Sequence, residues 1–509
     1  MKRPALVRAN IVVGFVLFCE AATRLHLVTR QTLVPPTEML TRLVSMAQGE
    51  EFWSQAQFTA LNILVSFLVA VGVGFVLGLV LHRMPRVRRA LEPMIASYYA
   101  LPFFVLYPLF IVLFGMNAVP IIFMGFLYAV MAMITGTLTG LDRVPRIFLK
   151  VGLSYGMGRA REAVLIQLPA AAPYVFTGTK LAFGYAITGV IGSEFILSNN
   201  GLGYGIAFSY NNFDDSTMYA LLIFVLTVVS MLTLLLHAAE QRVQYGARAG
   251  AGGRLLPEAT RTEWAVGFGS IALVLFVVWQ LVFLMVGREA IASPVATFQK
   301  LAQLLARPEF WGNVAETARA LGLSLAISCI AGALIGIVLG LSRVSGEILA
   351  PLLIAFYAMP KVTLYPVILL FFGIGLGAKV AFGALYGMIP MILITMNALA
   401  NMNPTLRRVG RSLRLSRGQT LFTILLPATV PEIVSGLRIS FSITLLGVMI
   451  GEMFASQRGL GFMIMNSMGV NDTATMMAVT VLVGGFAIAV NGALMSIDAR
   501  FHRASPQGH

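Results

Sequence analysis

The chain has 509 residues, of which 58% are hydrophobic and only 11% are charged. This composition leaves too little polar surface to cover a water-soluble globule, so it indicates an integral membrane protein. The formal net charge of +15 does not point to nucleic acid, because the basic residues gather in alternate loops between apolar runs. Cys19 and Cys329 lie inside apolar runs, and we expect neither a disulfide nor a metal site.

Apolar runs of about 20 residues, the length that crosses a bilayer, occur six times in each half of the chain. They cover residues 9–28, 58–82, 93–114, 117–139, 171–198 and 217–238, then 264–286, 316–341, 348–373, 376–398, 429–456 and 475–498. We therefore expect an all-α integral membrane protein with about twelve transmembrane helices. The alternating basic loops place both termini in the cytoplasm.

The first run follows Lys2, Arg3 and Arg8 and is short, which also fits a cleaved signal peptide. We expect it to be retained as a helix, because its counterpart at 264–286 is internal and cannot be a signal.

The two halves are copies of one unit. Matching positions share one offset, 258 residues between 53 and 311, and no gap is needed from about Pro36 to Ala220. Examples are Phe52-Trp53 with Phe310-Trp311, Tyr107-Pro108 with Tyr365-Pro366, Glu194 with Glu452, and Gly201 and Gly203 with Gly459 and Gly461. Such a constant register indicates duplication and fusion.

The repeat sets the expected organisation. We expect a first repeat at 1–239, a Gly-rich and Arg-rich cytoplasmic linker at 240–263, and a second repeat at 264–509. Since each half has an even number of spans, the repeats should be parallel and related by a pseudo-twofold axis along the membrane normal.

A long basic loop separates the fourth and fifth spans of each half, at 142–169 and 401–427. Its composition suits short helices against the membrane face. Each loop ends in Leu-Pro, where proline disfavours helical geometry in the residue before it, so the next span should begin with a bend. The positive-inside rule explains the arginines of these loops, but not their duplicated glycine and Leu-Pro ending.

The loops resemble the cytoplasmic loop of the membrane subunits of bacterial ATP-binding-cassette (ABC) importers, which carries an acidic residue, two alanines, a glycine and a final I-x-L-P. The matching stretches run from Lys150-Val151-Gly152 through Gly156 to Leu168-Pro169, and from Arg408-Val409-Gly410 through Arg414 to Leu426-Pro427. A base replaces the acidic residue in both copies, and Arg414 replaces the glycine in the second.

Other motifs are similar to the nitrate, sulfonate and taurine branch of these permeases. They are Tyr99-Ala100-Leu101-Pro102, Tyr357-Ala358-Met359-Pro360, Gly201-Leu202-Gly203 and Gly459-Leu460-Gly461. The resemblance implies two permease units of the type I importer fold fused in one chain, in the cell inner membrane. It also implies two copies of a cytoplasmic ATP-binding subunit and an extracytoplasmic solute-binding protein as partners, beside membrane lipid.

In that family the loops couple the permease to its ATP-binding subunits. The resemblance therefore implies coupling roles for Gly152, Gly156, Arg159, Leu168, Pro169, Gly410, Arg414, Ser416, Leu426 and Pro427. The chain itself has no P-loop, because none of its lysines follows a glycine. Energy must come from a partner or an ion gradient, and we expect no catalytic site and no cofactor.

Prolines and charges within the spans are candidates for the pathway or its gates: Pro102, Lys180, Glu194, Pro360, Lys361, Arg438 and Glu452. Lys361 lies deep in its span beside prolines that should break the helix, and its counterpart is Phe103. Its ammonium group either favours an anion in the pathway or pairs with a backbone carbonyl in a structural role.

Two other repeat-related pairs also have two interpretations. Lys180 and Arg438 either extend to the cytoplasmic surface or place two cations near an inner gate. Glu194 and Glu452 lie at the outer ends of their spans, where they either accept hydrogen bonds from turn amides or serve a gate or a binding-protein contact.

The favoured function is an ABC importer permease for a small anionic solute of the nitrate, sulfonate or taurine kind. The alternative is a secondary transporter with two parallel six-helix halves, driven by an ion gradient. The short loop with glycine and aspartate that such carriers have after the second span is absent from 82–91. A membrane enzyme is less favoured, since the spans hold no His or Cys cluster and no close carboxylate pair.

Overall fold

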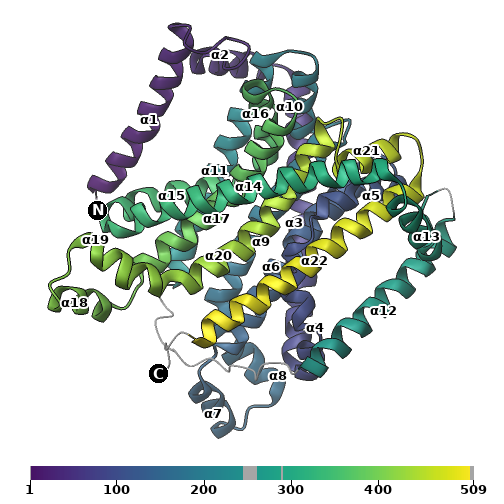
Figure 1. The fold of residues 1–509 in the computed structure, drawn as a ribbon. Helices are drawn as coiled ribbons and strands as arrows, with labels where there is room; N and C mark the ends of the chain where they lie inside the picture. Colours follow the sequence, from purple (N-terminus) through teal and green to yellow (C-terminus); the bar gives the residue numbers. More distant parts are fainter. Residues whose placement is uncertain (1, 245–260, 288–289, 505–509) are drawn as a thin grey trace.

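The computed structural model describes residues 2–244, 261–287 and 290–504, and all regular structure in these ranges is helical (Figure 1). The all-α prediction is confirmed. Most of the linker expected at 240–263 lies outside the described residues. Its first residues are helical, because the last helix of the first repeat continues to Gln244.

The two repeats have the same order of elements. The first contains α1 (Lys2–Arg24), α2 (Pro36–Met46), α3 (Glu50–Arg83), α4 (Pro85–Ser97), η1 (Tyr98–Ala100), η2 (Phe103–Leu106), α5 (Tyr107–Phe114), α6 (Ala118–Asp142), α7 (Arg146–Ser154), α8 (Arg159–Glu162), η3 (Ala163–Gln167), α9 (Leu168–Ile196), α10 (Leu202–Asn211) and α11 (Asp215–Gln244). The second contains α12 (Arg261–Val286), α13 (Pro294–Leu305), α14 (Pro308–Leu341), α15 (Arg343–Ala358), η4 (Lys361–Leu364), α16 (Tyr365–Phe372), α17 (Leu376–Ala400), α18 (Pro404–Ser412), α19 (Arg417–Thr420), η5 (Leu421–Leu425), α20 (Leu426–Phe454), α21 (Leu460–Gly469) and α22 (Thr473–Ala504).

Each of the twelve expected apolar runs coincides with a helix or with a pair of helices separated by a break. Within the described residues, eight helical segments are long and apolar enough to cross a membrane without interruption. A ninth candidate is the pair formed by residues 348–358 and 361–372, which is bent by 90°.

The third span of each repeat is broken at a proline. Pro102 has φ −78° and ψ 80°, and Pro360 has φ −72° and ψ 82°, so the backbone leaves the helix in the same way in both copies. A 3-10 turn, η2 or η4, follows each proline and leads into α5 or α16. The predicted break of the span that contains Pro360 is confirmed.

Glycines let the spans of each repeat approach closely. A Cβ atom on Gly74 of α3 would lie 2.7 Å from the Cβ of Met133 in α6, and one on Gly332 of α14 would lie 2.8 Å from the Cβ of Met391 in α17. The four-residue glycine spacing therefore serves close packing of α3 on α6 and of α14 on α17.

The repeats interlock rather than lie side by side as separate bundles. The first span of each repeat packs against the other repeat, α1 on α15 and α12 on α4 (Figure 1). The turns after the proline breaks also cross over, η4 onto α9 and η2 onto α20. The two broken spans and the two fifth spans thus both contribute to the junction between the repeats.

A pair of equivalent glycines offers a test of this packing. We expect Gly178→Ala to destabilise the chain by about 1–3 kcal/mol, since a Cβ there would lie 2.9 Å from the Cα of Gly136 and overpack two backbones. Gly436→Ala, its counterpart, meets the sulfur of the flexible Met391 side chain and should cost less. Thermal unfolding of both purified variants measures the difference; equal losses would contradict the argument.

Candidate functional site

The two loops between the fourth and fifth spans fold as predicted into short helices, α7 and α8 in the first repeat and α18 and α19 in the second. Both glycines of the motif are contact points. A Cβ on Gly152 would lie 3.0 Å from the Cδ1 of Ile166, and one on Gly410 would lie 2.9 Å from the Cγ2 of Thr420. Any larger residue would push the first short helix away from the segment that leads into the next span.

The turn between the short helices needs a left-handed residue in both copies. Gly156 has φ 60° and Arg414 has φ 50°. The two turns have the same hydrogen bond. The amide of Met157 donates to the carbonyl of Gly152, and the amide of Leu415 donates to the carbonyl of Gly410, each at 3.0 Å. Arginine in this region costs about 1–2 kcal/mol, so the second loop carries strain that the first avoids.

The expected bend at Leu-Pro is wrong. Leu168 and Leu426 are helical, with φ −64° and ψ −47° for Leu168 and φ −64° and ψ −50° for Leu426. A π-helical segment precedes each, η3 or η5, and runs directly into the span. In a π turn each carbonyl bonds to an amide five residues on, which moves away the carbonyl that the ring of Pro169 or Pro427 would otherwise strike.

Other predicted coupling residues lie at helix ends. Arg159 is the first residue of α8. Ser416 precedes α19, where its hydroxyl accepts the Gln419 amide at 3.2 Å while the Gln419 side chain accepts the Ser416 amide at 2.9 Å. This reciprocal cap fixes the start of the short helix.

Lys180 and Arg438 are each paired with an acidic residue of the sixth span. The ammonium group of Lys180 forms an ion pair with Glu240, and Nε of Arg438 lies 4.0 Å from Oδ2 of Asp498. Hydroxyls support both carboxylates: Thr177 donates to Glu240 at 2.7 Å and Ser435 to Asp498 at 2.6 Å. These pairs connect the fifth and sixth spans, a role that neither sequence interpretation included.

Glu194 and Glu452 are buried at the ends of their spans, with 0% and 1% of their surface exposed. Oε2 of Glu452 accepts hydrogen bonds from the hydroxyl of Thr317 at 2.8 Å and from the amide of Gly461 at 3.0 Å. The Thr317 hydroxyl in turn accepts the amide of Leu460 at 2.9 Å. These contacts fit the structural interpretation, in which a carboxylate caps the next helix.

The first repeat has the same arrangement. Oε2 of Glu194 accepts from the Thr59 hydroxyl at 2.8 Å and from the Gly203 amide at 3.1 Å, and Thr59 accepts the Leu202 amide at 2.8 Å. A Cβ on Gly201 would clash with the Glu194 carboxylate. The Gly-Leu-Gly motif is therefore explained: the first glycine leaves room for the carboxylate and the second brings its amide close.

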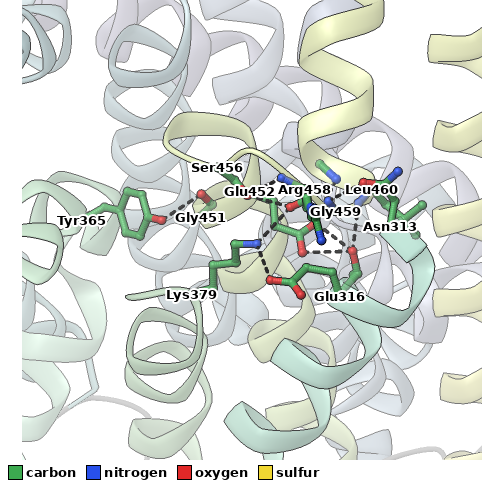
Figure 2. Close-up of polar contacts among 12 residues, drawn as sticks. Asn313, Glu316, Tyr365, Lys379, Gly451, Glu452, Ser456, Arg458, Gly459 and Leu460 are labelled. Carbon is green, nitrogen blue, oxygen red and sulfur yellow. Dashed lines mark hydrogen bonds and ion pairs between the residues drawn. The ribbon is translucent and has the colours of Figure 1, made fainter. Parts of the chain in front are cut away.

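Sequence reasoning missed a buried cation beside Glu452. Nζ of Lys379, which is 2% exposed, donates to Oε1 of Glu316 at 3.0 Å and to the carbonyl of Arg458 at 2.9 Å (Figure 2). The first repeat has Ile121 and Phe58 in place of the lysine and the glutamate. The signal was present in the sequence, because one span of the second repeat carries Glu316 and another carries Lys379, a pair of opposite charges that the first repeat lacks.

Lys361 is buried at the junction of the repeats, on η4 directly after the break at Pro360. Its Nζ donates to the carbonyl of Tyr357 at 2.9 Å and lies 4.7 Å and 5.2 Å from the ring centres of Tyr357 and Tyr386. Its counterpart Phe103 packs against Tyr128, with ring centres 5.7 Å apart. The lysine thus has the carbonyl partner of the structural interpretation and also lies where the two repeats meet.

Comparison with known proteins matches this architecture to one family twice. The model of the family described as binding-protein-dependent transport system inner membrane component matches residues 70–245 and again residues 329–504. The chain belongs to this family. The two matches also confirm that two units are fused, and they favour an ABC importer over the alternative of a secondary transporter.

Individual relatives correspond in length to one unit. A putative aliphatic sulfonates transport permease protein of Bacillus subtilis is 27% identical over 222 residues, 43% of this chain and 80% of the relative. The taurine transport system permease protein of Escherichia coli is 27% identical over 242 residues, 46% and 86% of the two chains. A nitrate import permease protein of Leptolyngbya laminosa is 26% identical over 236 residues, 45% and 84%. The chain is an inner-membrane, multi-pass permease of an ABC importer.

The threonine that links Glu194 to the next helix provides a test of the capping arrangement. Thr59→Val should destabilise the permease by about 2–5 kcal/mol, because the buried Leu202 amide loses its acceptor and Glu194 loses a donor. Thr137→Val is the matched control, since the Thr137 hydroxyl is buried without a hydrogen-bond partner. Thermal unfolding should show a loss for the first variant and none for the second; similar values for both would contradict the capping role.

Proposed function

We propose that this permease acts without a second permease chain, because its two repeats supply both membrane units of the importer. Two cytoplasmic ATP-binding subunits would bind one face, and an extracytoplasmic solute-binding protein would deliver the solute to the other. The observation that carries the proposal is the pair of loops, α7–α8 and α18–α19, which share their turn and their glycine contact.

The tips of these loops suit contact with another protein. Leu153 and Tyr155 in the first loop are 70% and 77% exposed, and Leu413 in the second is 63% exposed. Apolar side chains at a loop tip, beside the basic residues of α7 and α18, offer each ATP-binding subunit a surface to bury. The positive-inside rule assigns this face, and with it both termini, to the cytoplasm.

The proposed solute is a small anion. The names of the three relatives described above mention sulfonates, taurine and nitrate, and these three solutes each carry an oxyanion group. The chain agrees with this class at Lys361, a buried cation at the junction of the repeats. The gating residues proposed with it are Pro102 and Pro360, which break the third spans at that junction.

The proposed energy source can be tested in reconstituted vesicles. Uptake of the transported anion should require the ATP-binding subunits and ATP, because the chain has no P-loop of its own. Uptake should also continue after the proton gradient is collapsed, because ATP hydrolysis supplies the energy. Radiolabelled uptake with and without a proton ionophore is the measurement. Uptake by the chain alone, driven by an ion gradient, would overturn the proposal.

The two loops should differ in their response to exchange of the turn residue. Gly156→Arg places a side chain at φ 60° and should lower transport-coupled ATP hydrolysis, whereas Arg414→Gly relieves strain at φ 50° and should preserve it. The measurement is the ATPase rate of the reconstituted complex with binding protein and solute, with assembly checked by co-purification.

Each of the two variants is the control for the other, since both alter the same position of the repeat. Equal loss of coupled hydrolysis in both variants, or loss only in Arg414→Gly, would contradict the argument. In the second case Arg414 would act through its side chain rather than through the backbone of the turn.

A further inference from the structure

Two lysines are buried in the described part of the permease, and they differ in their partners. Lys379 is paired with Glu316, and Lys361, which is 6% exposed, has no carboxylate partner among the described residues. An ammonium group out of water is costly unless it is paired. Where the chain needs a lysine for structure alone, as at Lys379, it supplies the opposite charge.

The hydrogen-bonding capacity of Lys361 is largely unused. An ammonium group has three N–H donors, and the structure gives this one a single acceptor, the carbonyl of Tyr357. The faces of the Tyr357 and Tyr386 rings contribute cation–π attraction but accept no conventional hydrogen bond. Two donors of a buried cation thus remain for a ligand.

A second unused donor lies beside the lysine. Tyr386, the tyrosine whose ring lies under the ammonium group, is 3% exposed, and its hydroxyl is buried without a hydrogen-bond partner. Tyr128, at the equivalent position of the first repeat, packs instead against Phe103 and Phe104, with ring centres 5.7 Å and 5.0 Å away.

Lys361 and Tyr386 lie at the junction of the two repeats. The turn η4, which carries Lys361, packs on α9 of the first repeat. The ring of Tyr185 in α9 packs against that of Tyr99, with ring centres 5.4 Å apart. Elements of both repeats therefore meet beside Lys361.

We propose that Lys361 and Tyr386 form one internal binding site for a small oxyanion, a sulfonate or nitrate group, at the junction of the repeats. This proposal rests on the proposed import of an anion and adds where in the membrane the anion is held. The site offers an ammonium group with two unused N–H donors and one hydroxyl donor, so it complements the several acceptor oxygens of an oxyanion. There is one such site per fused chain, because Phe103 replaces the lysine in the first repeat.

The site is closed in this structure. Lys361 and Tyr386 are buried, and the rings of Phe195 and Phe454, at the ends of α9 and α20, stack with centres 4.4 Å apart. An anion reaches the site when the repeats separate along the junction that η2 and η4 form with the fifth spans.

Binding to the full chain in lipid nanodiscs tests the site directly. The probes are radiolabelled ethanesulfonate and nitrate, with the uncharged dimethyl sulfone as competitor. Lys361→Met should weaken binding of both anions roughly 10-fold or more, Lys361→Arg should recover part of it, and Tyr386→Phe should weaken it roughly 3- to 10-fold. Dimethyl sulfone should not compete. Lys300→Met, which removes a lysine that is paired with Asp472, is the control for net charge and should bind as the unaltered chain does.

Thermal unfolding separates a lost site from a misfolded chain. Lys361→Met removes a buried unpaired charge and should not lower the unfolding temperature. Unchanged anion binding in a folded Lys361→Met variant, or equal weakening in Lys300→Met, would overturn the proposal. If uptake still requires the ATP-binding subunits but does not depend on Lys361, only the site is wrong; if uptake does not require those subunits, the proposed function is wrong as well.

Discussion

The structure depends on the break in the third span of each repeat. A helix satisfies its own backbone polar groups in a bilayer, but a segment that leaves the helix at Pro102 or Pro360 does not. Such a segment is stable in a membrane only where protein surrounds it. Here the other repeat provides that surrounding, since η2 packs on α20 and η4 on α9. A single repeat would leave its break exposed to lipid, so the two repeats require each other.

The same constraint locates the region that can move. The packing of α3 on α6 and of α14 on α17 relies on glycines whose neighbours leave no room for a Cβ, which makes the inside of each repeat rigid. The junction instead consists of short turns, aromatic rings and a buried lysine. Rigid repeats that meet at an irregular junction are suited to movement of one repeat against the other, as in other transporters built from repeats.

Fusion lets the two copies diverge, because each copy always meets the same partner. Structural features stay symmetric: Glu194 and Glu452 cap equivalent helices, and Lys180 and Arg438 pair with equivalent carboxylates. Other positions differ. Lys361 in the second repeat corresponds to Phe103 in the first, Arg414 corresponds to Gly156, and Lys379 corresponds to Ile121. The second repeat thus carries the charges that the proposed anion site and the strained loop involve.

The sequence by itself determined the spans, the duplication, the short helices of the loops and the break at Pro360, because these follow from local composition and from an offset that can be read along the chain. It also predicted the wrong geometry at Leu168, since the rule for residues before proline does not anticipate a π turn. Only the tertiary structure decided which distant groups meet. Lys180 and Glu240 lie in different spans, and so do Lys379 and Glu316. The packing of α1 and α12 on the opposite repeat was likewise hidden, because apolar lipid-facing and protein-facing surfaces have the same composition and only the fold tells them apart.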